Sequence, residues 1–186
     1  HYKKFKGIVG DSDLKGNLVY EARAPRPLVT AKLISQSLNF ADLAPLIGAD
    51  SNANKMRRNA DVLQPENAVL PVEKFRTERW SSIDASVRFD AKKIIRDEAL
   101  PLENLHAVLH LNDGILKLDP LNFGVAGGEL FSTITLDGTH QPIQANIEIS
   151  PRHLKFKELF PKAESMRASL GEINGSVALK AEGESI

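Results

Sequence analysis

The stretch LENLHAVLHLNDGILKLD, residues 102–119, decides the fold class of this chain. In its first half every second residue is apolar: Leu105, Ala107, Leu109 and Leu111. A period of two is the alternation of a β-strand with one dry face and one solvated face. Asp113-Gly114 follows, and an Asp-Gly pair favours the φ > 0 turn of a tight hairpin. The stretch therefore predicts two antiparallel strands joined by a short turn.

Outward from this hairpin, the same alternation recurs over residues 83–90, 130–137 and 143–150, and more weakly over 18–22, 29–33 and 177–181. We expect Trp80 to open the strand that runs to Asp90. Reversals are predicted at Asp119-Pro120, Ala126-Gly127-Gly128 and Asp137-Gly138. Short connections place neighbours antiparallel, so we expect a mainly β protein. The expected architecture is a twisted antiparallel sheet of about eight to ten strands with two short helices.

The two helices are predicted at Asn39–Gly48 and Leu154–Pro161. In the first, Asn39 is a candidate N-cap and Gly48 a stop signal. Residues 49–69 between the helices and the later strands are polar with little periodicity, which predicts a polar loop.

A weak internal repeat relates the two halves of the chain. Glycine, proline, leucine and phenylalanine positions from Gly16 to Pro45 recur from Gly128 to Pro161 at offsets that rise from 112 to 116. We interpret residues 1–186 as a single fragment of a repeat-built β domain. Its predicted parts are a hairpin-plus-helix unit at 1–48, the loop at 49–69, and a strand meander at 70–186 that contains the second unit at 128–161.

The composition excludes several classes of protein. Lys plus Arg and Asp plus Glu number 24 each, so the net charge is zero. A nucleic-acid partner is not expected, because phosphate binding normally needs a basic surface. The chain has no cysteine, which excludes zinc ribbons, disulfide frameworks and thiol catalysis. Neither a signal peptide nor a membrane-spanning apolar run is visible, and we interpret the chain as a piece of a longer protein.

Three stretches carry a resemblance to the AsmA family of Gram-negative bacteria: residues 102–138, the pair of repeats, and residues 171–185 with their Gly-x-hydrophobic-x-Gly pattern. The resemblance implies a periplasmic protein tethered to the inner membrane by a helix absent from this sequence. It also implies an extended curved sheet with an apolar inner surface that holds or guides phospholipid between the two membranes, as part of outer-membrane biogenesis. Such a protein is not an enzyme and needs no cofactor.

We expect phospholipid acyl chains to contact the apolar side of the strands. The candidate residues are Ile83, Val87, Phe89, Leu109, Leu111, Leu118, Phe123, Val125, Ile134, Leu136, Ile147 and Ile149. The same face could instead pack on the two helices and the loop as an ordinary core. A rival function is a scaffold or assembly factor that contacts outer-membrane proteins through an exposed sheet edge.

Other constellations predict no reaction chemistry. His106 and His110 lie on a strand, where four residues span roughly 13 Å, too far for one metal ion. The carboxylates Asp113, Asp119, Asp137 and Glu148 are candidates for an acid/base pair, but most stand in turn sequences, where Asp bonds its own backbone. The basic cluster 55–58 could contact lipid headgroups, although a solvated loop explains it as well.

Overall fold

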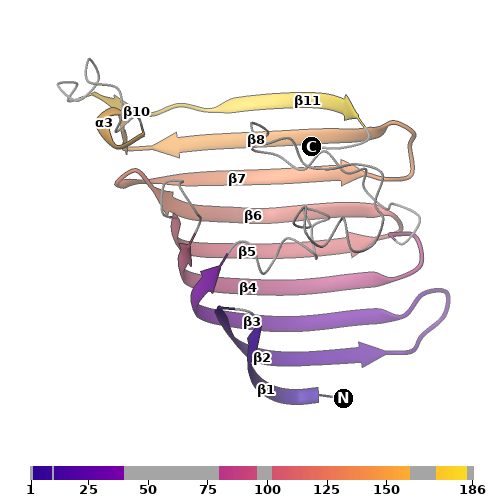
Figure 1. Cartoon of the computed structure of the whole chain (residues 1–186). Helices are drawn as coiled ribbons and strands as arrows, with labels where there is room; N and C mark the ends of the chain where they lie inside the picture. The colour runs from indigo at the N-terminus through magenta and orange to yellow at the C-terminus, as the bar shows by residue number, and fades with distance from the viewer. Residues whose placement is uncertain (1, 10, 40–79, 96–101, 160–170, 184–186) are drawn as a thin grey trace, which may run out of the picture.

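Most of the chain is one open, curved β-sheet (Figure 1). The computed structural model describes residues 2–9, 11–39, 80–95, 102–159 and 171–183. Within them, nine strands pair in the spatial order β1-β2-β3-β4-β5-β6-β7-β8-β11. The strands are β1 (Tyr2–Val9), β2 (Ser12–Glu21), β3 (Leu28–Asn39), β4 (Asp84–Ile95), β5 (Leu102–Asn112), β6 (Ile115–Val125), β7 (Gly128–Asp137), β8 (Ile143–Arg152) and β11 (Val177–Gly183). The predicted mainly β fold with a curved sheet is confirmed.

The sheet is mixed, whereas we expected every pair to be antiparallel. β3 and β4 run parallel, with Ala31 opposite Val87 and Leu33 opposite Phe89, and all other neighbours in the sheet are antiparallel. Alternation in a sequence shows which residues share a face, but it is the same for parallel and antiparallel strands. The local sequence pattern therefore does not indicate whether β4 runs parallel or antiparallel to β3.

A small second sheet stands at one end of the large one. β9 (Leu154–Lys155) pairs with β10 (Glu172–Ile173), and α3 (Phe156–Leu159) follows β9 directly. α3 lies within the helix predicted at 154–161, but it is only four residues long. The other predicted helix, beyond Asn39, the loop at 49–69 and the basic cluster 55–58 lie outside the described residues. The division into repeat units stays a prediction.

Three local predictions were wrong, and one strand was not predicted. Asp119-Pro120 does not reverse the chain: it lies inside β6, where the register against β7 shifts between Leu118 and Leu121. The extra residues are absorbed as a bulge, which bends a strand without ending it. Trp80 lies in a turn, and β4 begins at Asp84. β3 continues to Asn39, which we had expected to be the N-cap of a helix, and the lysine-rich β1 was not predicted.

The predicted β5–β6 hairpin is confirmed. Asp113 and Gly114 have φ values of 51° and 79°. Both lie in the left-handed region that the tight hairpin turn requires. Gly138 N donates to Gly114 O at 3.0 Å, so the β7–β8 turn is tied to this hairpin.

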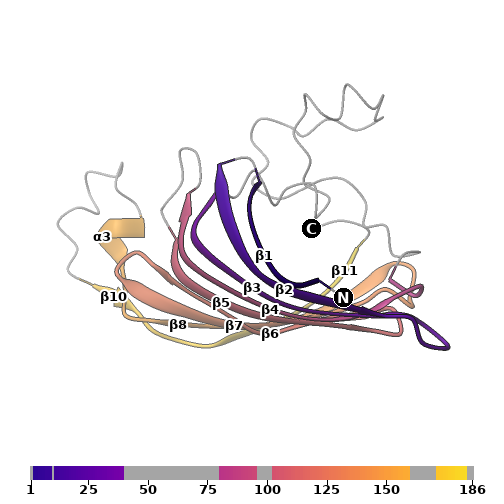
Figure 2. The ribbon, with the colours of Figure 1, turned by 90° about the horizontal axis from the view of Figure 1, so that it is seen from below.

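The sheet bends sharply toward one face near the C-terminal ends of β3 and β4 (Figure 2). Buried positions along these strands are three residues apart at the bend, from Ser35 to Leu38 in β3 and from Ala91 to Ile94 in β4. Leu38, Ala91 and Ile94 form a buried cluster, with Phe89, Leu102 and Leu105 packed against it. The inside of the bend is therefore apolar.

One carboxylate on β2 holds the bent segment of β3. Asp13 Oδ1 accepts the backbone N–H groups of Gln36 and Ser37, each at 2.8 Å, and the hydroxyl of Ser35 at 3.1 Å. The hydrogen bond from Ser37 N lowers the pKa of Asp13, although desolvation opposes it. A charged acceptor here satisfies backbone donors that the bend leaves without strand partners.

Gly128 allows a close approach between β7 and the end of β8. A Cβ at this position would meet the backbone carbonyl oxygens of Arg152 and His153. We expect Gly128→Ala to lower the free energy of unfolding by about 2 kcal/mol, because backbone atoms cannot move aside cheaply. Gly175→Ala is the matched control, since no atom lies within 4 Å of a Cβ there. Equal urea midpoints for the two variants would contradict this account.

Candidate functional site

The β-sheet register aligns apolar residues in rows that cross the strands. The central row runs over eight strands, from β2 to β11, without a polar residue. Its members are Leu18, Ala31, Val87, Leu109, Leu118, Ile134, Ile147 and Leu179. Residues directly opposite each other in adjacent strands point to the same face. One face of the sheet thus carries a continuous aliphatic band.

Two further rows flank the central one on the same face. The first consists of Tyr20, Val29, Ala85, Leu111, Leu116, Leu136, Ala145 and Ala181. The second consists of Gly16, Leu33, Phe89, Ala107, Leu121, Ser132, Ile149 and Val177. We call the surface made by the three rows the apolar face. It is the face toward which the sheet bends, because Phe89 of the second flanking row packs on the buried cluster inside the bend.

The structure places nine of the twelve predicted residues in these rows: Val87, Phe89, Leu109, Leu111, Leu118, Ile134, Leu136, Ile147 and Ile149. Phe123 and Val125 extend the face along β6, opposite Leu130 and Gly128 of β7. Ile83 precedes β4 and lies outside any strand. The prediction omitted the contributions of β2, β3 and β11, such as Leu18, Leu33 and Leu179, because their alternation is weaker.

The opposite face is mostly polar, although it includes scattered apolar residues such as Val19, Ile34 and Ile115. The row next to the central one contains Thr30, Ser86, His110, Lys117, Thr135, Asn146 and Lys180. His106 and His110 both lie on this face of β5, and His106 Nδ1 is 2.5 Å from Asp90 Oδ1. Among the described residues, no group of three or more metal-binding side chains gathers at one place.

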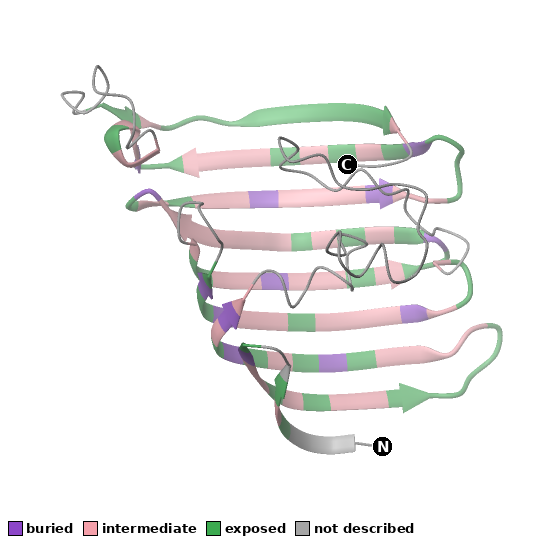
Figure 3. Cartoon of the chain, in the orientation of Figure 1, coloured by how far each residue is buried: buried purple, intermediate pink, exposed green. Residues whose placement is uncertain are grey.

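The apolar face is only partly covered. Of the side chains the structure describes, Leu38 and Ser35 are the largest that are fully buried. Across β6, β7 and β8 the residues of the central row are half-buried (Figure 3). On β11, Val177 and Leu179 remain 50% and 49% exposed. Within the described ranges no second sheet covers this face, because the other sheet has only two strands of two residues each.

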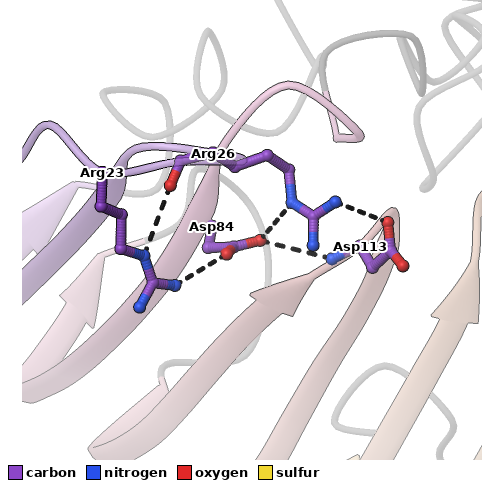
Figure 4. Close-up of polar contacts among 4 residues, drawn as sticks. All are labelled: Arg23, Arg26, Asp84 and Asp113. Carbon is purple, nitrogen blue, oxygen red and sulfur yellow. Dashed lines mark hydrogen bonds and ion pairs between the residues drawn. The ribbon is translucent and has the colours of Figure 1, made fainter.

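An ionic cluster joins three connections at one end of the sheet (Figure 4). Arg23 and Arg26 come from the β2–β3 connection, Asp84 begins β4, and Asp113 lies in the β5–β6 turn. Asp84 Oδ2 accepts from Arg23 at 2.8 Å, and Asp84 Oδ1 accepts from Arg26 at 2.9 Å. Arg26 also donates to Asp113 Oδ1 at 2.7 Å. The side chain of Asp84 is only 8% exposed, so the cluster buries one carboxylate under two guanidinium groups.

The hydrogen bond from Arg26 lowers the pKa of Asp84, with Arg23 and the backbone N–H of Asp113 acting in the same direction and burial opposing them. The sequence analysis missed this cluster. Asp84 was a polar position in an alternating run and Asp113 a turn residue, and nothing local connects either one to the arginines. The cluster is already paired internally, so it fastens the end of the sheet.

The four candidate acid/base residues lie apart, and the three aspartates among them are held by different partners. Asp113 pairs with Arg26 and Asp119 with Lys117, the latter at 2.7 Å. Asp137 accepts from the backbone and hydroxyl of Thr139 within its own turn. Glu148 lies opposite Thr133 on the polar face. Ion pairs and turn bonds account for the three aspartates.

Comparison with known proteins decides the family. A model of the AsmA family matches residues 1–186, the whole of the chain. The chain belongs to the AsmA family. It is 41% identical over 192 residues to the AsmA family protein YhjG of Escherichia coli (strain K12), and the match covers all of this chain. No solved structure matches the chain.

AsmA family proteins are associated with the bacterial cell envelope. The AsmA chain described here spans 28% of the length of its YhjG relative. None of the helices in the described residues has the length and apolar character needed to cross a membrane.

Proposed function

We propose that this AsmA-family chain is a non-enzymatic part of a cell-envelope protein whose apolar face holds or guides the acyl chains of phospholipid. The observation that carries the proposal is the central row, which is aliphatic across eight strands and ends in the half-exposed Leu179. Monomeric soluble proteins rarely expose large continuous apolar patches unless the patch binds something.

The dimensions of the face suit hydrocarbon. Eight strands are separated by seven spacings of about 4.8 Å, so the central row extends roughly 34 Å. The hydrocarbon core of a bilayer is about 30 Å thick, so the acyl chains of one leaflet reach roughly 15 Å. Each methylene buried against the face would contribute about 0.8 kcal/mol. A lipid could therefore rest at several positions along the row with similar free energy.

Membership of the AsmA family supports the cellular location that we propose for this chain. We propose that the sheet lies in the periplasm, that the longer protein is tethered to the inner membrane, and that its role belongs to outer-membrane biogenesis and lipid homeostasis. Catalysis forms no part of this proposal, and the three candidate aspartates are engaged in ion pairs and turn bonds. A surface that only shields hydrocarbon from water needs no reacting group.

Lipid extraction from protein purified out of envelope fractions tests the proposal. We expect mass spectrometry to detect phospholipid that co-purifies with the protein at a reproducible ratio. Protein washed with detergent and re-exposed to phospholipid vesicles should regain the lipid. Repeated absence of phospholipid under both conditions would refute the function.

A second function is favoured by one observation, the edge strand β11. Within the described residues β11 pairs on one side only, with β8, and every residue from Val177 to Glu182 is exposed. Such an edge can accept an added strand from another protein. This arrangement would suit a scaffold or assembly factor for outer-membrane proteins.

Site-specific photo-crosslinking separates the two functions. A photoreactive residue at Lys180 on β11 would capture a protein partner if strand addition is the function. The same residue at Leu118, in the middle of the apolar face, would capture lipid if acyl-chain binding is the function. Protein adducts at position 180, together with no lipid adduct at position 118, would favour the scaffold.

A further inference from the structure

Apart from the exposed hydroxyl of Tyr20, the polar side chains on the described part of the apolar face are few and already hydrogen-bonded. No position in the three rows carries a charged side chain, and along the described strands the face includes only three serines, Ser12, Ser35 and Ser132. These serines are 3%, 1% and 9% exposed. Polar groups that are both buried and bonded are unavailable to a ligand.

Each hydroxyl has a partner inside the protein. Ser132 Oγ donates to Leu121 O at 2.5 Å, where β6 is bulged. Ser35 Oγ donates to Asp13 Oδ1 at 3.1 Å. Ser12 Oγ accepts from Asn39 N at 2.8 Å. The serines thus complete irregular backbone in β3 and β6, and they leave the surface apolar.

Three cationic groups of the described residues, Arg23, Arg26 and Lys117, are already engaged by carboxylates. Arg23 and Arg26 are neutralised by Asp84 and Asp113 at the end of the sheet. Lys117 lies on the polar face and pairs with Asp119 at 2.7 Å. The two guanidinium groups are balanced by two carboxylates, so this cluster has no net charge with which to attract a phosphate.

We infer that the apolar face recognises the hydrocarbon chain alone, so that its affinity for an amphiphile depends on acyl-chain length and is indifferent to the headgroup. This inference rests on the proposed function. Its basis is the combination of uncharged rows, three internally satisfied serines and internally paired arginines. The headgroup would stay in water beyond the rows, where it adds no contact that distinguishes one lipid from another.

The test measures displacement of the fluorescent fatty acid cis-parinaric acid from the purified protein by single-chain competitors below their micelle concentrations. The competitors are palmitate, lysophosphatidylethanolamine and lysophosphatidylglycerol with the same 16-carbon chain. We expect dissociation constants within about threefold of one another, and a change of less than about twofold between low and high salt, because no ion pair forms. Shortening the chain by four carbons should weaken binding by up to about 200-fold.

A matched variant examines the polar group left exposed at the end of the rows. Tyr20 is 52% exposed, and its hydroxyl is the one polar group in the rows that a headgroup could reach. Tyr20→Phe removes that hydroxyl and keeps the ring, and we expect the dissociation constants of the three competitors to stay within about threefold of one another in this variant, as in the parent protein. A loss confined to one headgroup would overturn the inference.

The outcomes separate the inference from the proposed function. Binding that differs tenfold or more among headgroups of equal chain length would overturn the inference and leave acyl-lipid binding in place. Failure of every competitor and of the probe to bind, or affinity that does not change with chain length, would overturn both. Equal affinities with strong chain-length dependence would support both.

Discussion

Replacing Ile134 by glutamate is expected to weaken acyl-chain binding at least tenfold. Ile134 is a half-buried member of the central row, flanked by Leu118 and Ile147 on the neighbouring strands. A carboxylate there would lose hydration whenever hydrocarbon covered it, and such desolvation costs well over the roughly 1.4 kcal/mol that corresponds to tenfold. Displacement of cis-parinaric acid from the variant and the parent protein measures the change.

The matched control lies one residue along the same strand. Thr135 belongs to the polar face, between Lys117 and Asn146. Thr135→Glu adds the same charge at the same depth in the sheet, and we expect binding within about twofold of the parent. Melting curves of both variants check that each remains folded. Equal loss of binding in the two variants would mean that the apolar face is not where lipid binds.

The apolar face could be predicted because it depends on alternation alone. From Val87 to Ile149, five consecutive strands repeat the same two-residue pattern, and short turns fix their order as a meander. When neighbouring strands each have one apolar face, burying those faces together sets their register to within two residues. Sequence reasoning therefore recovered most of the face without any long-range information.

The sequence-based predictions that were wrong concern features that depend on contacts between segments distant in the sequence. The Asp119-Pro120 pair reads as a turn, yet pairing with β5 and β7 on both sides keeps β6 in the sheet and turns the irregularity into a bulge. The direction of β4 and the bend that Asp13 holds are likewise set by residues far away in the sequence. The local preference of a sequence for a turn is overridden where two neighbouring strands supply hydrogen bonds to it.

The ionic cluster shows the same limit at a single residue. In the sequence, Asp84 cannot be distinguished from Ser86 or Arg88, which also alternate with apolar residues. In the structure the whole Asp84 residue, backbone included, is 5% exposed, whereas Arg88 is an exposed residue. A carboxylate takes up a buried position only when its charge is compensated, and the arginines that compensate it are about sixty residues earlier in the chain.

Replacing Asp84 by asparagine is expected to lower the melting temperature by roughly 5–10 °C, because two arginines lose the carboxylate that compensates them in a poorly solvated position. Asp113→Asn is the matched control: it makes the same chemical change in the same cluster. The Asp113 side chain is 71% exposed, and asparagine tolerates the positive φ of the turn. The control should shift the melting temperature by no more than about 2 °C.

The pH dependence of stability gives a second test of the same buried carboxylate. Because the folded-state pKa of Asp84 is lowered, its charge stabilises the fold fully above the unfolded-state pKa of about 3.9, and the contribution is lost as the pH falls through the folded-state value. Asp13 has a lowered pKa too and adds to the loss in the same range. The parent protein should therefore lose more stability than Asp84→Asn when the pH is lowered from 7 to below 4. Parallel pH profiles for the two proteins would show that the buried carboxylate does not hold this end of the sheet together.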